Sequence, residues 1–103
     1  MIIYNTTFHI DKGYEKECLE YFKRTYMPEV SASGFLTNGY LRRIIPTAED
    51  EGTSFAVQFH VKNIETLNYW IEKEGRSLQK RVTDLFGNKI TGFVTLLEEI
   101  EWE

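Results

Sequence analysis

The chain has 103 residues, a formal net charge of −4 and a pI of about 5.2. This length suits one domain, and we expect residues 1–103 to form it. The acidic balance excludes nucleic acid as a partner, because nucleic-acid affinity depends on a basic surface that neutralises phosphates. The single cysteine excludes an intrachain disulfide and is typical of a reducing compartment.

The chain enters a strand pattern at its first residues, and no apolar run approaches the length that spans a membrane. We therefore expect a cytoplasmic protein with no membrane association. The first pattern, over residues 2–10, has the period of two that is typical of a half-buried strand. One side of it carries Tyr4, Thr6, Phe8 and Ile10, and the other carries Asn5, Thr7 and His9.

An amphipathic helix is predicted next, because an apolar residue recurs at every fourth position from Tyr14 to Tyr26. We expect the side chain of Asp11 to cap the start of this helix, since its oxygen can accept from the unpaired backbone N–H groups there. Pro28 is expected to end or kink the helix, because proline has no N–H to donate.

Two further strands are predicted over residues 35–45 and 55–61, joined by an acidic turn over residues 46–52. The short connection indicates a hairpin. The second of these strands has the clearest alternation in the sequence. Its apolar side is Phe55, Val57, Phe59 and Val61, and its other side is Ala56, Gln58 and His60. We expect the apolar side to face the helices.

A second helix is predicted after Asn63, a good capping residue, and a fourth strand over residues 91–102. Gly75 falls inside this helix and costs about 1 kcal/mol relative to alanine, so a kink or two separate helices both remain open. The element order is β-α-β-β-α-β. It predicts an α+β, ferredoxin-like fold, in which two helices cover one face of a four-stranded antiparallel sheet.

The other face of this sheet is predicted to carry no charge on its two central strands. Its residues there are Ile3, Asn5, Thr7, His9, Ala56, Gln58 and His60. A sheet face in water normally carries several charges, whereas small neutral side chains suit a second sheet or a wet cavity. We therefore expect a homodimer that packs sheet to sheet through this open face, with a C-terminal tail that can reach the partner.

With these elements in place, the sequence resembles the dimeric α/β-barrel group of ferredoxin-like proteins. More narrowly, it is similar to a small uncharacterised family, a domain of unknown function of about this length. The resemblance covers the whole chain and lies in the Met1–Tyr4 strand start, the Tyr14–Tyr26 helix, the Arg42-Arg43 strand, Phe55–Val61 and the Phe93–Ile100 strand. It implies the fold and the pairing of two copies, and it carries over no active site.

Neither the cysteine nor the histidines predict a reactive or metal site. Cys18 lies in the apolar stripe of the first helix, where a thiol behaves as a small hydrophobic group. His9 and His60 share the open face. If Thr7 lies opposite Gln58, the two histidines are about 13 Å apart along the strands, too far to share one ion. We therefore predict no metal and no cofactor.

Two functions remain open for the uncharged face. The first is a non-catalytic homodimer that binds a small molecule or associates with itself. The alternative is a cofactor-free monooxygenase or isomerase that acts on a small aromatic or quinol-like substrate. The ligand-binding candidates for both are Asn5, Thr7, Gln58, His60 and Trp70.

The resemblance to the dimeric α/β-barrel group supports Asn5 and Trp70 as ligand-binding candidates. Haem-degrading monooxygenases of the same barrel group place an Asn on the first strand and a Trp on the second helix beside the haem. Asn5 and Trp70 match these two positions by element. The predicted second helix contains no histidine to bind the iron, so the haem itself is not expected here.

Overall fold

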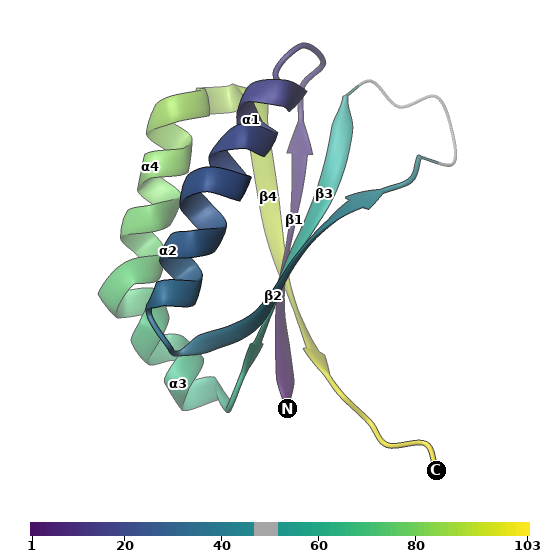
Figure 1. Cartoon of the computed structure of the whole chain (residues 1–103), viewed down its shortest axis with the longest axis vertical. Helices are drawn as coiled ribbons and strands as arrows, with labels where there is room; N and C mark the ends of the chain where they lie inside the picture. Colours follow the sequence, from purple (N-terminus) through teal and green to yellow (C-terminus); the bar gives the residue numbers. More distant parts are fainter. Residues whose placement is uncertain (47–51) are drawn as a thin grey trace.

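The computed structural model describes residues 1–46 and 52–103, and it contains one antiparallel sheet with strand order β2-β3-β1-β4 (Figure 1). The strands are β1 (Ile2–Ile10), β2 (Leu36–Ile44), β3 (Thr53–Val61) and β4 (Ile90–Glu98). The helices cover one face of the sheet, which confirms the predicted α+β, ferredoxin-like arrangement. β2 and β3 pair antiparallel, as in a hairpin; residues 47–51 of the predicted turn lie outside the described residues.

Two continuous helical stretches form the second layer, and each contains a π-helical segment. The first stretch comprises α1 (Glu15–Tyr21), η1 (Phe22–Tyr26) and α2 (Met27–Ala32). The second comprises α3 (Ile64–Trp70), η2 (Ile71–Gly75) and α4 (Arg76–Phe86), followed by the short 3₁₀ turn η3 (Gly87–Lys89). Gly75 therefore lies inside one continuous helical stretch, at the end of η2, and does not separate two helices. In the described part of the chain, no helix combines the length and the apolar character needed to cross a membrane.

The two predicted helix caps have opposite outcomes. Asn63 caps α3 as predicted, since its Oδ1 accepts from the backbone N–H of Thr66 at 2.8 Å. The prediction for Asp11 was wrong, because the residue before α1 is Tyr14 and no side chain caps it. Asp11 lies one turn further back, where its backbone carbonyl accepts from the N–H of Tyr14 at 3.1 Å. Pro28 does not end the helical stretch, which continues to Ala32; it lies at the start of α2, directly after the π-helical segment η1.

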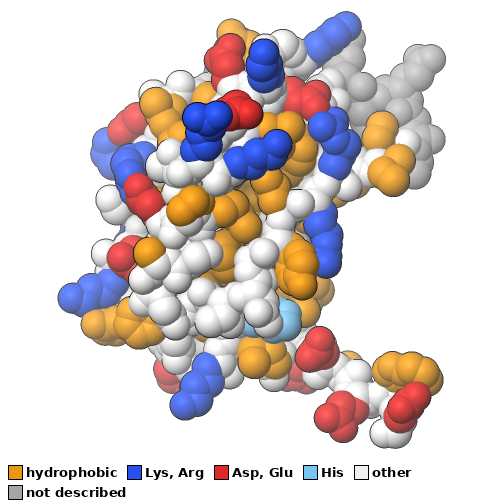
Figure 2. All heavy atoms as spheres, in the orientation of Figure 1, with side chains coloured by type: hydrophobic (Ala, Val, Ile, Leu, Met, Phe, Trp, Pro, Cys, Tyr) orange, Lys and Arg blue, Asp and Glu red, His pale blue; other side chains and the backbone are white. Residues whose placement is uncertain are grey.

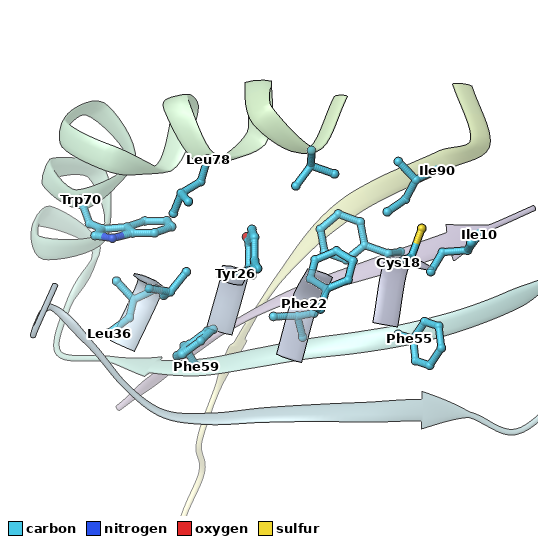
Figure 3. Packing of buried hydrophobic residues seen from close by; sticks show 14 of the residues in the cluster. Ile10, Cys18, Phe22, Tyr26, Leu36, Phe55, Phe59, Trp70, Leu78 and Ile90 are labelled. Carbon is cyan, nitrogen blue, oxygen red and sulfur yellow. The ribbon is translucent and has the colours of Figure 1, made fainter. Parts of the chain in front are cut away.

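The core lies between the sheet and the helix layer (Figure 3). Phe55 and Phe59 are 2% and 1% exposed, which confirms that β3 turns its aromatic side toward the helices. They pack with Phe22 and Trp70 from the two helical stretches, both nearly inaccessible to solvent. Removing this apolar surface from water is the main stabilising contribution to a fold of this kind.

The fourth strand ends earlier than predicted. β4 stops at Glu98, and one further backbone bond joins the N–H of Glu99 to the carbonyl of Met1 at 3.2 Å. The alternating pattern continues to Trp102, but the neighbouring β1 begins at Ile2 and offers nothing beyond that point to pair with. The residues from Glu99 onward therefore form a C-terminal tail without regular structure.

Candidate ligand-binding site

Four of the five predicted ligand-binding residues lie on the open sheet face. The strand register pairs Asn5 with Gln58 and Thr7 with Ala56, so their side chains point away from the helices. Asn5 Nδ2 donates to Thr7 Oγ1 at 3.1 Å, whereas Asn5 Oδ1 is buried with no partner among the described residues. His60 is on the same face, close to Asn38 at the beginning of β2.

Trp70 is on the opposite side of the sheet. Its side chain is 1% exposed and packs in the core, where its ring meets that of Tyr4 edge to face at a centroid distance of 6.0 Å. The structure therefore does not bring the five predicted residues into one site. In particular, Trp70 lines a pocket that does not include Asn5, although the resemblance to haem-degrading monooxygenases implied that the two residues share one.

The register between β1 and β3 differs by two residues from the one assumed above for the distance between the histidines. Gln58 lies opposite Asn5 rather than Thr7, and His60 lies opposite Ile3. His60 is therefore six residues along β1 from His9, or about 20 Å. The two histidines are thus farther apart than the assumed register gave, and too far apart to bind one ion within a chain. Within the described ranges, no group of three or more His, Cys, Asp or Glu residues is placed to hold a metal.

The open face is uncharged on its two central strands, as predicted. The edge strand β2 adds Arg42, whose guanidinium donates to Gln58 Oε1 at 2.6 Å and lies 4.3 Å from the ring centre of Tyr40. Arg43 points to the other side and pairs with Glu15 at 2.6 Å. Large apolar side chains at the two edges of the open face remain 41–64% exposed: Tyr40, Ile44, Phe93 and Leu97.

A pocket that the sequence analysis did not predict lies on the helix-facing side of the sheet. It is a cavity of about 100 Å³ between β1, β4 and the second helical stretch. Aromatic rings form much of its wall: Tyr4, Phe8, Tyr26 and Trp70. Thr6, Gln79 and Thr83 add hydroxyl and amide groups. Aromatic walls with a few polar groups are typical of sites for small molecules.

Two glycines let rings of the pocket wall lie directly against backbone. A Cβ atom at Gly92 would lie 2.9 Å from the ring of Phe8, and one at Gly75 would lie 2.8 Å from the ring of Trp70. Gly75 ends η2, and Tyr26 ends η1, so each π-helical segment contributes one residue to the pocket. Such segments occur frequently at functional sites. Gly75 inside a predicted helix, together with the candidate Trp70, was the signal in the sequence that pointed to this region.

The ionisable side chains of the pocket are two phenols. Burial raises the pKa of Tyr4, and a hydrogen bond with Thr6 offsets part of that rise. Burial also raises the pKa of Tyr26 well above its usual value. Both hydroxyls are therefore neutral at physiological pH and can donate or accept a hydrogen bond. Trp70 Nε1 is buried with no partner among the described residues, and such a donor is costly to leave unpaired.

The core position predicted for Cys18 is confirmed, since its side chain is 0% exposed. Burial raises the pKa of its thiol to about 11, with a smaller contribution from Glu17. We expect a thiol reagent to label the native protein at pH 8 at least about 100-fold more slowly than the denatured protein, because the thiolate is the nucleophile. Rapid native labelling would contradict the core assignment.

The same pKa sets a direction for stability. The unfolded thiol has a pKa of about 8.5, so between that pH and 11 the unfolded chain loses the proton more readily than the folded one. Ionisation of Cys18 should therefore reduce the free energy of unfolding as the pH rises through this window. A Cys18→Ala variant should lack this part of the pH dependence.

Comparison with known proteins identifies the family. The model of a domain of unknown function, DUF4286, matches residues 1–100. The chain belongs to this family. The match confirms the resemblance to such a family that the strand and helix pattern had suggested. No protein of curated function matches the sequence of this DUF4286 domain.

Two solved structures share its fold. An ethyl tert-butyl ether D (EthD) family protein from Bacillus halodurans has 16% sequence identity and a TM-score of 0.70, and the match covers 97% of this chain and 100% of that protein. A Deinococcus radiodurans protein named for the antibiotic biosynthesis monooxygenases has 14% identity and a TM-score of 0.58, covering 100% of this chain and 96% of its own. At these identities the likeness shows the ferredoxin-like fold and no shared activity.

Proposed function

We propose that this DUF4286 domain is a non-catalytic homodimer that binds a small, uncharged aromatic molecule in the pocket between β1, β4 and α4. The observation that carries the proposal is the pocket itself: a cavity of about 100 Å³ whose wall includes four aromatic rings and which adjoins the buried core. An interior normally has few voids larger than a water molecule. A space of this size, lined by aromatic and a few polar side chains, can hold a small molecule.

The dimensions of the pocket favour one aromatic ring. An engineered cavity of about 150 Å³ in another protein binds benzene, so a space of about 100 Å³ that opens to solvent allows one ring at most, with any substituent directed toward the opening. Val94, at the edge of the pocket, is 53% exposed, which gives such a ligand a route from solvent. The hydroxyls of Tyr4 and Thr83 offer hydrogen bonds to one polar substituent.

The electrostatics of the pocket favour binding over catalysis. Its ionisable groups are Tyr4 and Tyr26, and the raised pKa of each keeps the phenol protonated at neutral pH. A general base works best with a pKa near the operating pH, which neither phenol has. A neutral wall also favours a neutral ligand, because a buried charge needs a partner.

The homodimer is proposed on the open sheet face. Its central strands carry no charge, Arg42 is held by Gln58 and Tyr40, and the two edges present large exposed apolar side chains. A second copy would cover this surface through an isologous interface. The pocket lies on the other side of the sheet, so binding and dimerisation use separate surfaces of one domain.

Two matched variants of β4 test the pocket, with phenol as the probe. Val94→Phe places a ring at the pocket edge, and Leu96→Phe introduces the same ring two residues along the same strand face, outside the pocket wall. By calorimetry or ligand-observed NMR, we expect Val94→Phe to weaken phenol binding at least about tenfold, which is about 1.4 kcal/mol, and Leu96→Phe to leave it unchanged.

A phenol site on the open face would give a different result. If phenol bound equally to wild type and Val94→Phe but was lost in Asn5→Ala or His60→Ala, the ligand site would be on the open face and the proposed pocket would be refuted. Absence of saturable phenol binding to the wild type would also count against the proposal.

A further inference from the structure

The C-terminal tail, Glu99–Glu103, stands clear of the rest of the molecule. It extends from the end of β4 away from the helix layer, toward the side of the open sheet face (Figure 1). Figure 2 shows its acidic side chains beside apolar ones at the lower edge of the molecule. Ile100 and Trp102 are 77% and 87% exposed, the latter the most exposed of the large hydrophobic residues in the described part of the chain.

The tail has the composition of a half-buried strand without a neighbour. Ile100 and Trp102 alternate with Glu99, Glu101 and Glu103, so an extended tail presents one apolar and one acidic side. β4 ends opposite the first residue of β1, and only the N–H of Glu99 bonds one residue further, to Met1, so the tail has no strand of its own chain to join. A surface that could receive such a segment should offer aromatic side chains together with a cation.

A surface of this kind lies at the start of β2. Phe35 and Tyr69 stack edge to face at a ring-centre distance of 5.3 Å and are 40% and 50% exposed. The ammonium of Lys73 lies 5.9 Å from the ring centre of Tyr69. Phe35, Tyr69 and Lys73, here called the aromatic corner, would match the indole of Trp102 and the carboxylates beside it.

The tail and the aromatic corner of one chain lie at opposite edges of its sheet, and a sheet-to-sheet dimer would bring the tail of one copy toward the corner of the other. The tail leaves the β4 edge of the sheet, whereas the corner is beside the β2 edge. β4 runs antiparallel to β2, so β4 ends at the end of the sheet where β2 begins. When two such sheets face each other about a two-fold axis along the strands, the end of β4 in one copy lies over the start of β2 in the other.

We propose that the tail is an arm that binds the aromatic corner of the second copy, burying Ile100 and Trp102 against Phe35 and Tyr69. The proposal rests on the homodimer of the proposed function. By symmetry each dimer holds two such contacts. The buried indole supplies the apolar part of each contact, and Lys73 faces the acidic side of the tail.

Site-directed cross-linking tests the position of the arm. Glu103→Cys and Lys73→Cys are made in separate chains, which leaves all four aromatic and aliphatic contact residues in place. The two variants are mixed, allowed to exchange subunits and oxidised. We expect a disulfide-linked heterodimer. Glu103→Cys mixed with Lys16→Cys, which places the thiol on α1 far from the corner, should give at least about tenfold less cross-linked product, since a disulfide requires Cα atoms within about 7 Å.

Dimer affinity gives a second readout. We expect Trp102→Ala to raise the dimer dissociation constant at least about tenfold and Trp102→Phe to restore most of the affinity, as for an aromatic anchor. A wild-type dimer with no preferential cross-link, or with unchanged affinity in Trp102→Ala, would overturn the arm while leaving the dimer intact. A monomeric wild type would overturn both.

Discussion

Ala56→Arg should convert the dimer into a monomer. Ala56 lies near the centre of the open face, opposite Thr7 on β1 and Arg42 on β2. In a sheet-to-sheet dimer the new guanidinium would be taken out of water beside the equivalent charge of the second copy. An unpaired buried charge costs several kcal/mol, so we expect the dimer dissociation constant to rise more than about 100-fold. Light scattering or sedimentation measures the mass directly.

The control for this variant is Ala32→Arg. Ala32 is exposed on α2, in the helix layer, so the same residue change adds the same charge without touching the open face. It should leave the dimer mass unchanged. Both variants should keep the wild-type far-ultraviolet circular dichroism. A dimer of unchanged mass in Ala56→Arg would place the interface elsewhere.

Trp70→Ala should produce the largest loss of stability. Trp70 is 1% exposed, packs edge to face with Tyr4 and lies against the backbone of Gly75. Removing the indole leaves a cavity that the helix layer can close only in part, so we expect the free energy of unfolding to fall by about 3–5 kcal/mol. Urea unfolding at fixed protein concentration measures the difference.

A control variant and a rescue by added indole test this expectation. Leu85→Ala, at a 59% exposed position on α4, should change the free energy of unfolding by less than about 1 kcal/mol. Added indole should restore part of the stability of Trp70→Ala, because the new space adjoins the pocket. A Trp70→Ala variant as stable as Leu85→Ala would show that Trp70 is not a core residue.

Periodicity predicted the faces of the strands correctly but not their alignment. The alternation of Phe55 and Phe59 with Gln58 identified the side of β3 that meets the helices. A shift of two residues preserves every face assignment, so the same alternation could not determine whether Gln58 lies opposite Asn5 or Thr7. The end of β4 is set by the start of its neighbour β1, and the alternation within β4 carries no information on that.

The pocket could not be predicted for a related reason. It depends on Phe8 lying against Gly92, a contact between strands far apart in the sequence, and on Trp70 lying against Gly75, five residues further along the same helical stretch. The helical pattern alone does not reveal the second contact. Gly75 is an unfavourable residue inside a helix. The structure explains its presence, because the ring of Trp70 packs against its backbone and leaves no room for a Cβ atom. The resemblance to haem-degrading monooxygenases pointed to Trp70 by its element alone, and the structure places this residue on the helix-facing side of the sheet, away from the other four candidates.

A titration of the ¹⁵N-labelled protein with phenol, followed by amide NMR, tests the site of binding most directly. We expect saturable shifts centred on the amides of Gly75, Thr83 and Gly92, around the pocket between β4 and the helices. Shifts centred instead on Asn5 and Gln58, or no saturable shifts at all, would contradict it.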